Sequence, residues 1–171
     1  GEIRWIHSDL YPLRWTDERY RLVIVSRDVT ERRRREREYE QIFDTVNDAI
    51  TVHDPETGEI LEVNDTYVEE FGYDESTILD LGVEGLSVTD AGYTGERSRE
   101  IIREVAETGE SVTVEWLVET ADGERRWYEV NTTPARIGGE PRVLGISRDV
   151  TERKRRERMT EALHDSTERI Q

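Results

Sequence analysis

Nearly the same thirteen residues occur twice in this chain, and this repeat constrains the fold more than any other feature. "SRDVTERRRRERE" begins at Ser26, and "SRDVTERKRRERM" begins at Ser147, 121 positions later. The match continues upstream, so that residues 1–30 correspond to residues 123–151. A period near 120 residues is too long for a solenoid repeat and indicates whole domains in tandem.

The pattern of strands and helices predicts one complete domain of the α+β class. A hairpin at "AITVHDPETGEILEVN" precedes two short helices, for which Asp65 and Asp74 are the expected N-caps. A longer helix ends at Gly109, and three antiparallel strands joined at "ADG" and "IGGEP" follow it. We expect the complete domain over residues 47–151, between a linker helix at 31–46 and a C-terminal linker or coiled-coil helix at 152–171.

The ends of the chain indicate an excerpt from a longer protein. The chain begins with Gly1 in the middle of the repeat. Residues 1–30 carry only the last two strands and the helix start of the repeated unit. We therefore expect residues 1–30 to be the C-terminal strands of a preceding domain.

The charge of the chain is strongly negative and unevenly distributed. Its formal net charge is −16, and residues 41–150 hold 26 acidic against 8 basic residues, a net of −18. Lys154 is the single lysine. An acidic, lysine-poor surface favours adaptation to high salt over an ordinary acidic protein from a GC-rich genome. It also argues against direct binding of nucleic acid by this segment.

The absence of cysteine and of long apolar runs excludes several classes of protein. Without cysteine the chain has no disulfide, no thiolate metal site and no cysteine nucleophile. Three scattered histidines make a metal site unexpected. No apolar run approaches the roughly 18 residues of a membrane helix, so we expect no membrane span in this segment and a cytoplasmic location.

Three segments in order give the chain a resemblance to the PAS sensor family over roughly residues 36–153. They are "EILEVNDTYVEEFGY", "DGERRWYEVNTTP" and "GISRDVTER". The resemblance implies a five-stranded antiparallel sheet, with short helices that cover one face and enclose a pocket. It also implies flanking helices that pair in dimers, and it makes residues 1–30 similar to the end of a preceding PAS domain.

The resemblance also implies a ligand site on the inner face of the sheet. Strand alternation places Thr51 and His53 on one face and Ile50 and Val52 on the other. Similarity to the flavin-binding branch of the family points the first pair inward. A small aromatic or polar ligand would then contact eight residues; the alternative is a filled core with one satisfied histidine. The eight residues are Thr51, His53, Tyr67, Trp116, Val118, Tyr128, Val130 and Ser147.

The identity of a cofactor stays unknown. In the light-sensing branch a cysteine attacks flavin, and the matching segment "LGVEGLSV" has none, which excludes covalent flavin. In the haem-binding branch a histidine on the long helix ligates iron, and "GERSREIIREVAETG" has none, so haem is not expected. Non-covalent flavin has no support in the sequence.

Each copy of the repeat carries the spacing of a helix capping box at the end of its last strand. Asp149 precedes Glu152 by three residues, and Asp28 precedes Glu31 likewise. Thr151 and Thr30 are competing N-cap candidates. The resemblance implies that this junction passes signals from the pocket to the C-terminal helix. The alternative is a rigid linker in which these residues only cap a helix.

The C-terminal helix and the outer sheet face are the expected dimer contacts. Met159, Leu163, Ser166 and Ile170 follow the spacing of a short two-helix seam. Ile50, Val52, Leu144 and Ile146 would form an apolar outer face. Glutamates interleave with the arginines of the two basic runs, which favours solvated, salt-bridged helices over contact with nucleic acid or membrane.

No catalytic constellation is visible, so we predict a sensory and dimerisation module without enzymatic activity. His164 in "EALHDSTERI" keeps a histidine kinase open as the parent protein, because a histidine on such a helix could lie near a phosphoacceptor. The segment lacks the proline expected of that motif, and it better resembles the helix before a GAF domain. A linker histidine is therefore favoured.

Overall fold

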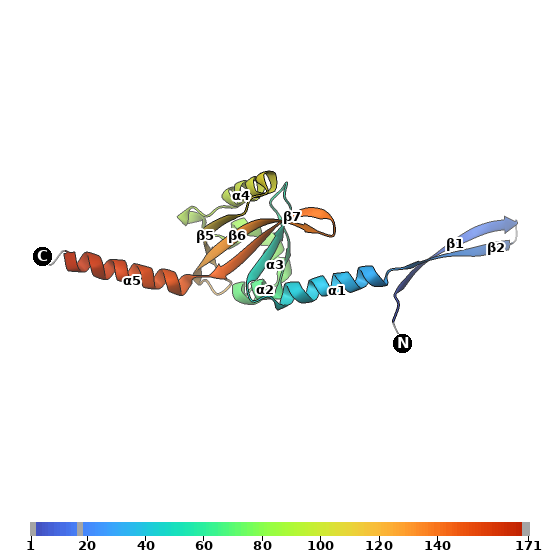
Figure 1. Ribbon diagram of the computed structural model, residues 1–171, viewed down its shortest axis with the longest axis horizontal. Helices are drawn as coiled ribbons and strands as arrows, with labels where there is room; N and C mark the ends of the chain where they lie inside the picture. The colour runs from blue at the N-terminus through green and yellow to red at the C-terminus, as the bar shows by residue number, and fades with distance from the viewer. Residues whose placement is uncertain (1–2, 17–18, 169–171) are drawn as a thin grey trace. The chain divides into compact units, whose positions relative to one another are not determined.

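The computed structural model describes residues 3–16 and 19–168, and within these it does not describe the side chains of residues 15–20 and 162–168 (Figure 1). The chain divides into two compact units, Gly1–Phe43 and Asp44–Gln171. Each unit is described by itself.

The first unit is a two-stranded hairpin followed by most of a helix. Strands β1 (Ile6–Thr16) and β2 (Arg19–Asp28) pair antiparallel, and α1 (Thr30–Thr45) follows them. Large apolar side chains lie exposed on both strands, with Ile6, Leu10, Leu22 and Ile24 each about 60% exposed. The helix carries the expected pairs along one face, among them Arg32 and Glu36 at 2.8 Å.

The second unit contains a five-stranded antiparallel sheet in the strand order β4-β3-β7-β6-β5, with its short helices on one face and the C-terminal helix extending away from the sheet (Figure 1). This arrangement confirms the expected α+β fold. In chain order the elements are β3 (Ala49–His53), β4 (Ile60–Val63), α2 (Asp65–Phe71), α3 (Glu75–Leu86), the 3-10 helix η1 (Thr89–Ala91), α4 (Gly95–Thr108), β5 (Val112–Glu119), β6 (Arg125–Ile137), β7 (Glu140–Asp149) and α5 (Thr151–Glu168).

Short-range hydrogen bonds set where the helices begin, and one expectation about them was wrong. Asp74 caps α3 as expected, accepting from Thr77 N at 2.8 Å. The cap of α2, however, is Asn64 and not Asp65: Asn64 Oδ1 accepts from Tyr67 N at 3.0 Å. Asn64 has the extended backbone that an N-cap requires, whereas Asp65 already lies in the first turn of the helix.

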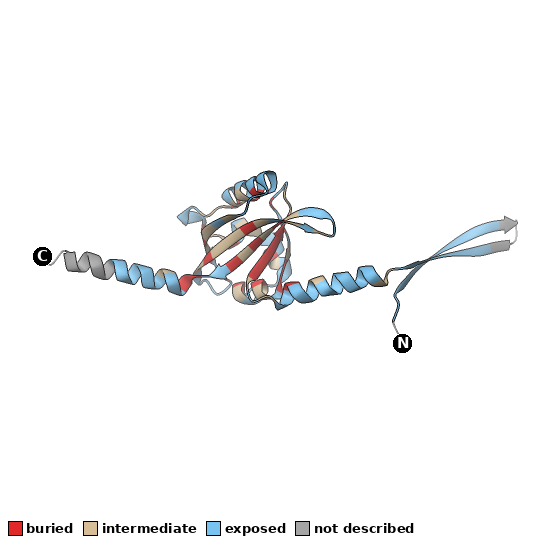
Figure 2. Cartoon of the chain, in the orientation of Figure 1, coloured by how far each residue is buried: buried red, intermediate tan, exposed pale blue. Residues whose placement is uncertain are grey.

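The core of the second unit lies between the inner sheet face and the helices. Buried residues gather on the sheet, whereas α4 and residues 152–161 of α5 are mostly exposed (Figure 2). Phe71 on α2 stacks on Tyr67 with ring centroids 4.0 Å apart and on Tyr128 of β6 at 5.1 Å. Such aromatic burial is a large favourable contribution to folding, and it holds α2 against the sheet.

Candidate functional site

A cavity of about 70 Å³ lies within this core. One water needs about 10–15 Å³, so the cavity has room for a few waters or a small organic molecule. All eight residues predicted to contact a ligand line it: Thr51, His53, Tyr67, Trp116, Val118, Tyr128, Val130 and Ser147. Whether they bind a ligand stays a prediction.

Strand pairing explains why residues so distant in sequence meet here. Thr51 pairs with Gly145, Val130 with Ser147, and Trp116 with Tyr128. Side chains that are directly opposite on adjacent strands point to the same face. Four strands therefore contribute to one wall, and α2 adds Tyr67.

His53 is a neutral, buried hydrogen-bonding group of the cavity. Its Nδ1 lies 3.2 Å from the carbonyl oxygen of Gly58, which can only accept, so the proton belongs on Nδ1. The Thr51 hydroxyl then donates to Nε2 at 2.8 Å. Burial lowers the pKa of His53 to about 4, against the smaller opposing effect of the Gly58 carbonyl. The ring is consequently uncharged at neutral pH.

Gly145 provides the space for this histidine–threonine pair. A Cβ at this position would lie 2.6 Å from Thr51 Oγ1 and 3.5 Å from His53 Nε2. Any larger residue would push on the Thr51 hydroxyl. The sequence pattern had no signal for this role, because the close approach comes from strand β3, 94 residues away in the chain.

The rest of the wall is polar but uncharged. Trp116 Nε1 donates to Ser87 Oγ at 2.8 Å, and the Ser87 hydroxyl donates to the Val83 carbonyl. Among the lining residues that the structure describes, none is Asp, Glu, Lys or Arg. Sequence reasoning missed Ser87, Ser98 and Thr132, which also line the cavity. Ser87 directly follows α3 and Ser98 lies in α4, so strand alternation cannot orient either of them.

Tyr128 lines the cavity and also lies near the carboxylates of Glu70 and Asp149. Its hydroxyl and Glu70 Oε2 are buried and lack hydrogen-bond partners within the described part of the chain. Burial is the main cause that raises the pKa of Glu70; Asp149 and Asp48 raise it further, and Tyr128 and Arg126 oppose them. Tyr128 of the cavity wall is also paired in register with Asp149, the last residue of β7.

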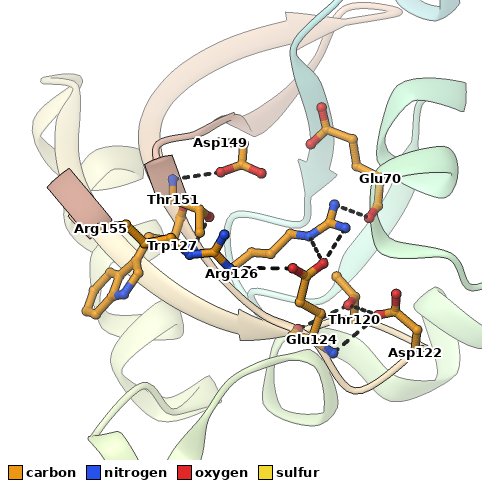
Figure 3. A network of polar contacts seen from close by, with 9 residues as sticks. All are labelled: Glu70, Thr120, Asp122, Glu124, Arg126, Trp127, Asp149, Thr151 and Arg155. Atoms are coloured by element: carbon orange, nitrogen blue, oxygen red, sulfur yellow. Dashed lines mark hydrogen bonds and ion pairs between the residues drawn. The ribbon is translucent and has the colours of Figure 1, made fainter. Parts of the chain in front are cut away.

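The end of β7 holds the predicted signal junction, a name that we keep below for Asp149, Val150 and Thr151. Asp149 Oδ1 accepts from Thr151 N at 2.7 Å (Figure 3). Thr151 Oγ1 accepts from Trp127 N at 2.9 Å, and Val150 N donates to the Trp127 carbonyl at 2.8 Å. The first residue of α5 is thus bonded to the backbone of β6.

The first copy of the repeat makes the same contacts. Asp28 Oδ1 accepts from Thr30 N at 2.9 Å, and Thr30 Oγ1 accepts from Trp5 N at 2.8 Å. Val29 N donates to the Trp5 carbonyl at 2.9 Å. The strand register is also equivalent, because Ile6 pairs with Asp28 as Tyr128 pairs with Asp149.

These contacts differ from the expected capping boxes. In a capping box the N-cap side chain accepts from the backbone N–H three residues on, and the carboxylate of that third residue accepts from the N-cap backbone N–H. Here each aspartate accepts from the threonine two residues later. The structure gives no bond from Glu152 or Glu31 back to either aspartate, in the residues it describes. The threonine hydroxyls instead bond a neighbouring strand.

Thr151→Val is expected to loosen the start of α5. It keeps the shape of the side chain and removes the acceptor for Trp127 N, which should lower the free energy of unfolding by about 1 kcal/mol. Amide exchange should rise in the first turn of α5. Thr160→Val is the matched control, since the Thr160 hydroxyl only donates to the Arg156 carbonyl on the same helix. Equal effects of both changes would contradict this role.

A second set of polar contacts joins α2, β6 and α5 near the junction. Glu124 pairs with Arg126 at 2.6 Å and with Arg155 of α5 at 3.5 Å (Figure 3). Arg126 Nη1 also donates to the carbonyl oxygen of Glu70 at 3.4 Å. These groups are partly exposed, so each pair contributes little on its own.

The predicted dimer contacts are only partly within the described residues. Met159 is 68% exposed on α5. The side chains of Leu163, His164 and Ser166 are outside the description, and so is Ile170 altogether. On the sheet, Ile50 pairs with Ile146 and Val52 with Leu144, which gathers these four on the face opposite the cavity.

The described residues offer neither a metal site nor a membrane-spanning helix. Within residues 3–16 and 19–168, no group of three or more His, Asp or Glu side chains could hold a metal ion. No helix in the same ranges is long and apolar enough to cross a membrane.

Known proteins with similar sequences are sensors and kinases much longer than this chain. The methyl sulfide methyltransferase-associated sensor of Methanosarcina acetivorans is 27% identical over 122 residues, which are 71% of this chain and 12% of that protein. A blue-light-activated histidine kinase of Brucella ovis is 48% identical over 52 residues, 30% of this chain and 10% of that protein. The chain thus spans about a tenth of the length of these relatives.

Among solved structures, the PAS domain of an HTR-like protein from Haloarcula marismortui superposes with a TM-score of 0.57. Its sequence is 30% identical to this chain, and the superposed region covers 70% of this chain and 98% of the Haloarcula marismortui domain. The family described as "PAS fold" matches residues 43–155, which include the sheet, the cavity and the signal junction. The chain therefore belongs to the PAS-fold family.

Proposed function

We propose that this chain is a non-catalytic sensory and dimerisation module of a larger signal-transduction or transcription regulator. In this function the cavity takes up a small molecule, and the resulting change in the sheet passes through the signal junction to α5. The observation that carries the proposal is that strand β7 runs directly from the cavity wall to the signal junction. Gly145 and Ser147 of this strand line the cavity, and the strand ends two residues later at Asp149.

The chemistry of the wall favours a small, neutral ligand. His53 is uncharged, and the described lining residues include no ionisable group that is charged at neutral pH. Burying a ligand charge there would leave it without a counter-charge, at a high cost in free energy. Hydroxyls and aromatic rings suit a molecule with one or two polar groups on an apolar body.

Native mass spectrometry of the chain, prepared in high salt, tests this function. The expected spectrum shows a dimer with additional mass that is lost on denaturation. Ser147→Leu fills part of the cavity and should remove that additional mass without dissociating the dimer. Ile146→Leu on the opposite face of the same strand should keep it. Bare chain masses in all three proteins would contradict the ligand-binding role.

Dimerisation rests on the expected contacts of α5 and of the outer sheet face. Met159 on α5 supports it with an exposed apolar side chain, and Leu144 and Ile146 stay partly exposed on the outer sheet face, whereas Ile50 and Val52 are already buried within the chain. A monomer at micromolar concentration in analytical ultracentrifugation would overturn this part of the proposal.

We further propose that residues 1–30 are the last two strands of a preceding PAS domain. Equivalent strand register and equivalent junction contacts support this assignment. The apolar side chains of Ile6, Leu10 and Leu22 correspond to Tyr128, Thr132 and Val143, which are buried in the second unit. Restoring the missing front half of the domain should bury them.

The histidine kinase alternative draws support from the Brucella ovis relative, which is named a blue-light-activated histidine kinase. The covalent flavin chemistry that the resemblance to the light-sensing branch would imply requires a cysteine, which this chain lacks. Phosphorylation of the full-length protein on His164, found with radiolabelled ATP and lost in His164→Gln, would favour the kinase.

A further inference from the structure

Trp127 lies beside the signal junction and faces two cations of α5. Lys154 Nζ is 5.3 Å and Arg158 Cζ is 5.5 Å from the centroid of the Trp127 ring. Both distances are within the range in which a cation is attracted to the face of an indole. Lys154 and Arg158 are four residues apart, so they lie one above the other on the same side of the helix.

The first copy of the repeat has the same arrangement, built from its own residues. Arg33 Cζ lies 4.9 Å and Arg37 Cζ lies 5.2 Å from the centroid of the Trp5 ring. In both copies the cations stand three and seven residues after the junction threonine. The first of them is arginine in one copy and lysine in the other. A guanidinium and an ammonium share little hydrogen-bond geometry, so the common feature is the positive charge over the ring.

The backbone of Trp127 is held in place by hydrogen bonds that do not involve its ring. Trp127 N and its carbonyl oxygen bond Thr151 and Val150 on either side of the strand–helix boundary. Tyr93 packs edge-on against the Trp127 ring, with centroids 5.7 Å apart, and the same tyrosine contacts Trp116 of the cavity wall at 5.3 Å. A ring held in this way can report a change at the cavity to the helix.

We propose that Trp127 is a positioning residue that fixes the rotation of α5 about its axis through Lys154 and Arg158, and that Trp5 does the same for α1 through Arg33 and Arg37. The junction bonds set where each helix begins, and the two cations set which side of the helix faces the strand. Only the consequence for signalling rests on the proposed function.

Ion pairs also reach this part of α5, and the test must separate them from the ring. Lys154 contacts Glu115 on β5, and Arg153 pairs with Glu115 at 3.1 Å and with Glu129 at 3.7 Å. These pairs would hold the helix close to the sheet without Trp127. These ion pairs are formed with the carboxylates of β5 and β6, and they do not involve the face of the indole ring.

The single lysine permits a selective probe of the arrangement. Reductive methylation with ¹³C-formaldehyde labels Lys154 and the N-terminal amine only, and keeps the positive charge. Over the indole face, the Lys154 methyl resonance should lie upfield of its position in the denatured chain. Trp127→Leu should return it to that position, and Trp127→Phe should give an intermediate shift. Glu115→Gln should leave it upfield.

Hydrogen exchange of α5 provides the second measurement. Trp127→Leu should speed the exchange of residues 154–158 by about tenfold, while β3 keeps its protection. Fluorinated tryptophans introduced at position 127 keep the shape of the ring and weaken its attraction for cations, so exchange should rise stepwise with fluorination. They also give a result if Trp127→Leu does not fold.

Two results would overturn the proposal. One is a Lys154 resonance that stays the same in Trp127→Leu and moves to the denatured position in Glu115→Gln. The other is exchange of α5 that does not respond to fluorination. Because both experiments use the chain without ligand, an empty cavity in the mass spectrum would reject the proposed function and leave this test intact.

Discussion

Replacement of Asn64 by leucine should lower the free energy of unfolding by about 3–5 kcal/mol. Asn64 is fully buried, and its Oδ1 accepts from Ile50 N at 2.8 Å as well as from Tyr67 N. Its Nδ2 donates to the carbonyl oxygen of Asp48 at 3.1 Å. A leucine of similar size would leave Ile50 N and the Asp48 carbonyl without this partner, whereas Tyr67 N keeps the backbone carbonyl of Asn64 as its acceptor.

Urea denaturation in high salt would measure this loss. Asn47→Leu is the matched control, because it makes the same change at an exposed position and should alter stability by less than about 0.5 kcal/mol. Asn64→Asp keeps the two accepting interactions and loses only the donated bond, so its effect should be intermediate. Equal stability of the two leucine variants would show that the bonds of Asn64 do not hold α2 on the sheet.

Acidification should destabilise the protein through His53. Burial lowers its pKa to about 4 in the folded chain, whereas the unfolded chain has the ordinary value near 6.5. The unfolded state therefore binds the proton first as the pH falls, and stability is lost from about pH 6.5 down to pH 4. Between pH 7.5 and pH 5 the loss from this group is about 2 kcal/mol.

The measurement compares the slope of unfolding free energy against pH in the wild type and in His53→Gln. The variant should lack this part of the slope, although its stability at pH 7.5 can also differ. His7→Gln serves as the control, because His7 is exposed and should leave the slope unchanged. A His53→Gln slope equal to that of the wild type would contradict a neutral, buried His53.

The alternation of strand residues was sufficient to predict the inner face of the sheet. Thr51, Tyr128 and Ser147 could be oriented because neighbours in a strand point to opposite faces. The same reasoning could not assign Gly145, whose role depends on the approach of Thr51 from another strand. Residues contributed by helices, such as Ser98 of α4, carry no such periodic signal.

Local hydrogen bonds were harder to predict than the face of the sheet to which each side chain points. Asn64 and Asp65 are both good N-cap residues, and only the backbone path through the end of β4 decides between them. The Asp-Val-Thr-Glu spacing fits a capping box, yet Trp127 from another strand takes the Thr151 hydroxyl. The spacing of residues describes a single segment of the chain, whereas these contacts also depend on a second segment that becomes its neighbour only in the folded protein.

The coupling of the cavity to α5 is the central claim, and hydrogen exchange of α5 in Ser147→Leu tests it most directly. Overpacking the cavity should strain β7 and change exchange in residues 151–158 several-fold. Ile146→Leu, on the same strand but facing away from the cavity, should leave α5 as in the wild type. Altered exchange in β7 of Ser147→Leu, with α5 identical in all three proteins, would contradict the claim.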